Sequence, residues 1–217
     1  GLAVTPLRGS GAYVVTWPRW NNGAMVDAGA VVRCPPGGGC AGPVTPAVAL
    51  TGNRASDGLL ASASALANGH YVSRWPSWDN AAVVDAGAVV WGNGGQPADG
   101  VVVGTGIALH GTQAGDRVGL QFPLVLDNGH YIVGSPEWDN IDLVDAGAVT
   151  WADGNGGTTG PVGELDSTVG AQAGNGLSAE QLLGAPGNYY LVASQTFSNG
   201  AAINAGAALR AAAGGAA

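Results

Sequence analysis

The chain of 217 residues contains 39 glycines, and 46% of its residues are hydrophobic while only 10% are charged. Such a composition can bury a core, but frequent glycine favours turns and close backbone approaches over long helices. The formal net charge is -8 and no lysine occurs, so nucleic acid is excluded as an expected partner, because polyanions are bound by basic surfaces.

An internal repeat organises the whole chain. The triplet Ala-Gly-Ala begins at Ala28, Ala86, Ala146 and Ala205, which gives spacings of 58, 60 and 59 residues. A Gly-Leu pair opens each copy, so the units are 1–57, 58–118, 119–175 and a shorter 176–217. We therefore expect a single domain built from four repeats of about 59 residues.

Each unit is expected to form three to four short antiparallel strands. In the third unit the first extended segment is 120–126, and the second, 130–133, follows the turn residues Asn128-Gly129. The third segment is the apolar run that includes Ala-Gly-Ala. The fourth is predicted at the short apolar runs 43–44, 101–103 and 161–162. The last unit has no such run, so three strands are expected there.

A four-stranded antiparallel unit repeated in this way is typical of a β-propeller blade. The glycine inside each Ala-Gly-Ala suggests a strand whose backbone lies close to another. The predicted fold class is therefore all-β and β-propeller-like, with a β-solenoid or a sandwich of stacked hairpins as alternatives. The absence of lysine leaves sheet edges without their usual protection, which favours closure or pairing with neighbours.

Two cysteines, Cys34 and Cys40, flank the segment Pro-Pro-Gly-Gly-Gly. Their closeness predicts a disulfide that closes a local loop. Structural zinc fits less well, because it needs four ligands and no further cysteine exists. A disulfide indicates an oxidising compartment, so an extracellular location is expected. We expect no membrane insertion, since no run of about 18 apolar residues occurs.

Three segments carry a family resemblance. Residues 128–140, 144–151 and 111–119 resemble tandem repeats of large, secreted, haemagglutinin-like bacterial adhesins, and are more distantly similar to FG-GAP repeats, the blades of integrin-type propellers. The resemblance implies a secreted or cell-surface protein with adhesive or structural work and no catalysis. FG-GAP calcium loops carry aspartates at alternate positions, and 153–155 and 139–142 are incomplete matches. No cofactor is expected, with calcium as the remaining candidate.

A repeated aromatic residue, followed two positions later by asparagine, forms a candidate carbohydrate site. An indole face can stack on a pyranose while amide and carboxylate groups bond its hydroxyls. In the alternative, the aromatic packs between adjacent units and the asparagine satisfies turn backbone. The candidate residues are Trp17, Trp20, Asn22, Trp75, Trp78, Asp79, Asn80, Trp138, Asp139, Asn140, Phe197 and Asn199.

The residue before each Ala-Gly-Ala is a second candidate. Asp27, Asp85 and Asp145 are suitable calcium ligands by type. Alternatively each carboxylate caps its hairpin loop by accepting backbone N–H groups, which Asn204 in the last unit can also do.

No triad or nucleophile elbow is present, so no enzyme is predicted. A polysaccharide-active enzyme would have to use the acidic group Glu137, Asp139 and Asp142.

The preferred function is a non-enzymatic, extracellular, adhesin-like repeat module for surface adhesion or structural assembly. The first alternative is a multivalent carbohydrate-binding lectin, whose partners are glycans or a host or cell surface. The second is a self-assembling fibre or array subunit, in which the shorter last unit accepts a strand from another copy of the chain. Exposed tryptophans favour the lectin, and buried ones favour assembly.

Overall fold

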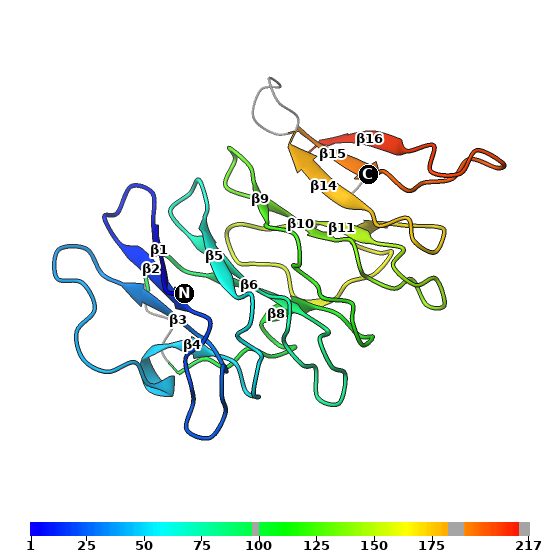
Figure 1. Ribbon diagram of the computed structural model, residues 1–217. Helices are drawn as coiled ribbons and strands as arrows, with labels where there is room; N and C mark the ends of the chain where they lie inside the picture. Colours follow the sequence, from blue (N-terminus) through cyan, green and yellow to red (C-terminus); the bar gives the residue numbers. More distant parts are fainter. Residues whose placement is uncertain (97–99, 182–188, 213–217) are drawn as a thin grey trace.

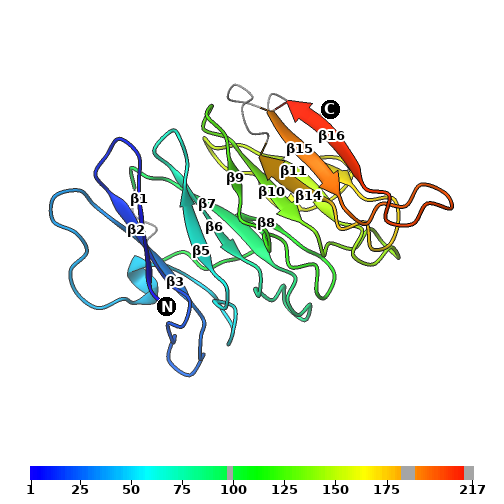
Figure 2. The same cartoon turned by 45° about the horizontal axis from the view of Figure 1, so that its top comes forward.

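The computed structural model describes residues 1–96, 100–181 and 189–212. They form four sheets, one for each predicted unit, arranged side by side in an open row (Figures 1 and 2). The all-β class and the four repeats are therefore confirmed, while no closed propeller is found in this part of the chain. Figure 1 shows unit 1 and unit 4 at opposite ends of the row.

The sheets are built from short strands, and the consecutive strands that pair within a unit are antiparallel. Unit 1 contains β1 (Ala3–Pro6), β2 (Tyr13–Trp17), β3 (Ala30–Cys34), η1 (Pro46–Val48) and β4 (Leu50–Thr51). Unit 2 contains β5 (Ser62–Ala65), β6 (Tyr71–Trp75), β7 (Ala88–Gly92) and β8 (Ala108–His110). Unit 3 contains β9 (Leu124–Val125), β10 (Tyr131–Ser135), β11 (Ala148–Ala152), β12 (Gly160–Pro161) and β13 (Ser167–Val169). Unit 4 contains β14 (Ser178–Gln181), β15 (Tyr189–Ser194) and β16 (Ala207–Ala212).

The prediction that the runs 43–44, 101–103 and 161–162 form the fourth strand of their own sheet is wrong. The fourth strand of each complete sheet is β4, β8 or β13, which pairs with the third strand of its own unit. The predicted runs reach across to the preceding unit instead: β12 pairs in parallel with β8, and Val102 bridges in parallel to Thr51. The run 43–44 forms no strand in unit 1. Neighbouring units therefore share main-chain hydrogen bonds.

Apolar side chains fill each junction between successive units. At the first junction Val14 and Val31 of unit 1 belong to one core with Trp75 of unit 2. The second and third junctions repeat this arrangement, with Val72 and Val89, then Ile132 and Val149, facing the following unit. In units 2 and 3 one face of the sheet (the front face) packs on the next unit, and the other (the rear face) packs on the preceding one. Unit 1 packs on its neighbour through its front face alone, and unit 4 through its rear face alone.

The glycine of each Ala-Gly-Ala lies where the backbones of two units almost touch. A Cβ added to Gly29 would lie 2.5 Å from the Cα of Gly58, and one added to Gly147 would lie 2.1 Å from the backbone N of Leu177. Gly29 and Gly147 also have φ values of +77°, which favour glycine. The predicted close backbone approach is confirmed.

Gly147→Ala is expected to lower the free energy of unfolding by roughly 3 kcal/mol or more, because the new methyl group meets backbone that cannot move aside. Gly206 has nearly the same φ, +74°, but a Cβ added there would lie 3.6 Å from the nearest atom, the carbonyl oxygen of Ser194. Gly206→Ala is therefore the matched control and should cost only about 1 kcal/mol. Urea unfolding followed by circular dichroism measures both, and equal losses would contradict the steric explanation.

Candidate functional site

The repeated aromatic, Asp and Asn positions lie in the loop that joins the second and third strands of each unit, whereas Trp17 and Trp75 are the last residues of β2 and β6. In unit 3 the N–H of Trp138 donates to the carbonyl of Ser135 (3.1 Å), and the carbonyl of Trp138 accepts from the N–H of Gly147 (2.8 Å). Asn140 and Leu143 exchange two backbone hydrogen bonds, at 3.1 and 2.9 Å. The same loop bonds recur around Trp20 and Trp78, so each loop has a defined shape.

The aromatic side chains belong mainly to the junctions. Trp75, Trp78 and Trp138 are only 0%, 2% and 5% exposed, so their ring faces cannot stack on a sugar. For these three residues the carbohydrate prediction is wrong, and the packing alternative describes them. In the first unit, which has no sheet before it in the row, Trp17 is 41% exposed and Trp20 is partly buried. Phe197 is also partly buried.

The repeated asparagines hold the loop backbone. The side chain of Asn80 donates to the carbonyl of Gly111 (3.3 Å), and that of Asn140 donates to the carbonyl of Gly170 (3.1 Å). Asn22 and Asn199 form the equivalent backbone pairs at their loop tips. Asn80 and Asn140 thus bond the backbone that follows the fourth strand of their unit rather than the backbone of their own turn.

The prediction that Asp27, Asp85 and Asp145 cap their loops is wrong. These residues lie in the left-handed region, with φ between 51° and 55°, and their own N–H groups donate to a side chain six positions earlier. Asn21, Asp79 and Asp139 are the acceptors, at 2.8 to 2.9 Å. The Asp27 and Asp85 carboxylates instead form ion pairs with arginines, Arg19 and Arg117.

The acidic residues of unit 3 do not gather into a cation site. Glu137 forms an ion pair with Arg117 at 3.5 Å, and the carboxylate of Asp139 accepts a hydrogen bond from the N–H of Asp145. Within the described ranges, no group of three or more His, Cys, Asp or Glu side chains could hold a metal ion.

At each of the first two junctions a buried carboxylate that the sequence pattern did not indicate links two loops of neighbouring units. Asp116 is fully buried and accepts N–H groups from Thr112 and Gln113 of its own unit, both at 2.8 Å. It also accepts the N–H of Asp139, in the aromatic loop of the next unit, at 3.0 Å. Asp57 makes the same three bonds one unit earlier. Asn175 occupies the equivalent position in unit 3.

Burial raises the pKa of both Asp57 and Asp116 above the ordinary value of 3.8. The backbone N–H donors oppose this shift, since they stabilise the ionised form, and the neighbouring loop carboxylates Asp79 and Asp139 add to it. Desolvation is the largest effect. At the equivalent position of unit 3, the neutral amide oxygen of Asn175 accepts one N–H group, that of Gln172.

An open hollow lies beside the aromatic loop of unit 3. Its volume is about 580 Å³, and its lining includes Gln113 of unit 2 together with Asp139, Asn140, Asp142 and Glu164. The side chain of Gln113 donates to the carbonyls of Asp139 and Ile141, both at 3.1 Å. Trp138 contributes to the wall although it is almost fully buried.

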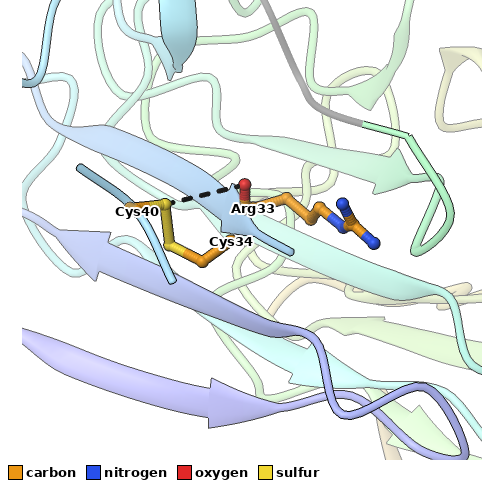
Figure 3. The surroundings of a disulfide bond; sticks show 3 residues. All are labelled: Arg33, Cys34 and Cys40. Atoms are coloured by element: carbon orange, nitrogen blue, oxygen red, sulfur yellow. Dashed lines mark hydrogen bonds between the residues drawn. A yellow bond between two sulfur atoms is a disulfide. The ribbon is translucent and has the colours of Figure 1, made fainter. Parts of the chain in front are cut away.

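The disulfide between Cys34 and Cys40 is formed, with Cα atoms 5.0 Å apart (Figure 3). It closes the loop that follows β3, next to the backbone of Arg33. None of the described residues forms a helix that is long and apolar enough to cross a membrane. The disulfide is compatible with the predicted extracellular location.

Asp116→Ala should lower the free energy of unfolding by on the order of 2–4 kcal/mol, because three buried N–H groups lose their acceptor. Asp116→Asn keeps one oxygen, as Asn175 does, and should cost less.

The stability of the wild type and that of Asp116→Asn should also depend differently on pH. Because the folded pKa of Asp116 lies above 3.8, its contribution to stability is complete below that value and is lost as the pH rises through the folded pKa. The stability gap between wild type and Asp116→Asn should therefore shrink from pH 3 to pH 7, as measured by urea unfolding. A gap that widens over this range would show that the fold favours the ionised form.

The repeat is also recognised by comparison with known families. The chain matches a family model described as DUF5650, a repeat of unknown function, over residues 8–60, 65–120, 125–179 and 185–209. No curated protein sequence is similar enough to the chain to count as a match. Each of the four matched segments contains the loop between the second and third strands of one sheet, and together the segments cover most of the chain. The chain therefore belongs to the DUF5650 repeat family.

Proposed function

We propose that the chain is a non-enzymatic, extracellular, adhesin-like repeat module, in which propeller-type blades form a rigid row that presents adhesive loops. The observation that carries the proposal is an exposed aliphatic side chain at the same loop position in every unit. Val26, Val84, Val144 and Ile203 are 55%, 57%, 57% and 79% exposed. Single exposed apolar residues are ordinary, but one in every repeat forms a regular series.

The spacing of this series is fixed by the junctions. In units 2 and 3 the loop is tied to the preceding unit, because Asp57 and Asp116 accept the N–H groups of Asp79 and Asp139. Figure 1 shows the loops that follow β2, β6, β10 and β15 projecting along one edge of the row. Several weak contacts presented on one rigid body gain strength through multivalency.

The extracellular location is supported by the disulfide, since such bonds persist in oxidising compartments. The resemblance of residues 128–140 and 144–151 to haemagglutinin-like adhesin repeats favours a cell-surface role. The low charge of the chain agrees with contacts that are apolar rather than ionic.

A variant in which Val26, Val84, Val144 and Ile203 are all serine should reduce adhesion of the source cells to apolar plastic at least tenfold, with single variants losing much less. The serine side chains stand in solvent, so folding should be retained. In a control variant, three other exposed apolar residues are changed to serine: Val48, Phe122 and Leu165. Antibody labelling of intact cells reports the location, and unchanged adhesion or a purely internal protein would refute the proposal.

A lectin is the second candidate, and the hollow in unit 3 is the observation that favours it. Its lining combines amide and carboxylate groups of Gln113, Asn140, Asp142 and Glu164, which suit the hydroxyls of a sugar. Asp142→Asn should weaken binding to a glycan array about tenfold, the cost of one hydrogen bond to a charged group. Asp27→Asn, in the corresponding loop region of unit 1, is the control, and equal binding by both would exclude the hollow as a sugar site.

A further inference from the structure

Two histidines hold equivalent turns in units 2 and 3. His70 and His130 stand directly before β6 and β10, and each bonds the turn that follows the third strand of its unit. Nδ1 of His70 accepts the backbone N–H of Gly94, and Nδ1 of His130 accepts that of Gly154, both at 3.1 Å. Both glycines are buried, and a Cβ added to them would lie only 1.8 and 1.7 Å from a carbonyl oxygen. These N–H groups need an acceptor, and the imidazole supplies it.

The same two turns connect neighbouring units. The carbonyl of Gly94 accepts the Nε–H of Arg33 in unit 1 (3.0 Å), and the carbonyl of Gly154 accepts the Nε1–H of Trp91 in unit 2 (2.9 Å). Asn68 of unit 2 donates to the carbonyl of Gly154 as well (2.8 Å). Each glycine is thus bonded to its own unit through its N–H and to the preceding unit through its carbonyl.

Protonation of the imidazole removes the acceptor. A neutral imidazole accepts through one nitrogen, whereas both nitrogens are donors in the charged form, and histidine ordinarily gains its charge between about pH 8 and pH 5. The N–H of Gly94 then loses its partner. His110 differs, because its Nδ1 lies 2.9 Å from the carbonyl of Gly111, which can only accept. That nitrogen already carries a proton, so its bond survives in acid.

Positive groups surround the turn that His70 holds. Arg33 of unit 1 bonds this turn through its guanidinium, and the carbonyl of Arg8 lies against the turn that precedes His70. Tyr71, whose ring lies against the end of β7, stays neutral, because burial raises its pKa to about 12. A charged His70 would therefore meet a like charge at Arg33, which opposes its protonation in the bonded arrangement.

Negative groups surround His130 instead. A carboxylate oxygen of Asp153 lies 3.2 Å from Nδ1 of His130, and Asp127 belongs to the same turn of the chain. Asn93 and Ala67 stand at the corresponding positions in unit 2. When His130 is protonated it can donate to Asp153, so the charged form keeps a partner. The two histidines make the same bond when neutral and have different partners when charged.

We propose that His70 is an acid-sensitive latch: its neutral imidazole holds unit 2 against unit 1 near neutral pH, and its protonation loosens that junction. Because the neutral form makes the bond, the contribution of His70 to stability is complete above the pH range in which histidine titrates and is lost as the pH falls through it. The junction between units 2 and 3 resists acid better, since protonated His130 pairs with Asp153. The latch does not depend on the adhesive role proposed above.

Hydrogen exchange followed by NMR at about pH 7.5 and about pH 5 tests the latch. The protection factor compares each amide with an unstructured peptide at the same pH, so the pH dependence of exchange itself cancels. Gly94 reports the turn, and Val103 reports the junction, because its N–H donates to the carbonyl of Thr51 in unit 1 (2.9 Å). In the wild type both protection factors should fall about tenfold in acid, the effect of one lost hydrogen bond. That of Val162, which bonds the carbonyl of His110 across the next junction (2.9 Å), should fall much less.

Exchanged side chains separate the imidazole from other acid effects. In His70→Gln the amide oxygen can accept the N–H of Gly94 but does not titrate, so the fall in acid should disappear. His130→Gln is the matched control and should keep the fall at Gly94. Asn93→Asp gives His70 a carboxylate and should make that fall smaller, whereas Asp153→Asn should enlarge the fall at Gly154. Circular dichroism confirms that each variant folds.

Wild-type protection that is unchanged in acid, or a fall that persists in His70→Gln, would overturn the latch. A fall at Gly94 without one at Val103 would confine the effect to the turn and would also overturn it. If His70→Gln does not fold, Asn93→Asp decides, and a fall at Gly94 as large as that of the wild type counts against His70 as the sensor.

Discussion

The structure depends on one constraint: a sheet of three to five short strands cannot bury its two apolar faces alone. Most of the strands have two to five residues, and isolated sheets of this size are marginally stable in water. Each sheet therefore completes its core against the next, as in other repeat proteins, where stability is the sum of units and nearest-neighbour junctions. The aromatic loop residues, the paired glycines and the buried carboxylates all serve these junctions.

The close approach of two backbones explains why a buried acceptor stands beside each junction. Where Gly87 meets Val118, the two backbones are too close for a Cβ on the glycine, and the N–H groups buried nearby need an acceptor. Asp57 and Asp116 accept three N–H groups each and pay a desolvation cost. Asn175 accepts fewer without a charge. The common requirement is an oxygen at this position, and the negative charge is secondary.

The repeat period, the four units and the disulfide follow from the sequence because each depends on local spacing. The fourth strand does not, since Val101–Val103 and the run that forms β8 are both short and apolar, and only long-range pairing decides which joins its own sheet. Asp57 and Asp116 were missed because their flanks differ: Gly58 follows Asp57 directly, whereas two residues separate Asp116 from Gly119. The spacing of 59 residues between them was the available signal.

The burial of Trp75, Trp78 and Trp138 has a consequence for recognition. Aromatic side chains that close the junctions are not accessible to a partner, so the binding that we propose for the row would depend on its loops. Those loops differ in sequence at their tips, from Gly23 to Ile141, while their bases share the same hydrogen bonds. Variation at the tips can therefore alter what is bound without disturbing the junctions, which is how repeat proteins separate specificity from stability.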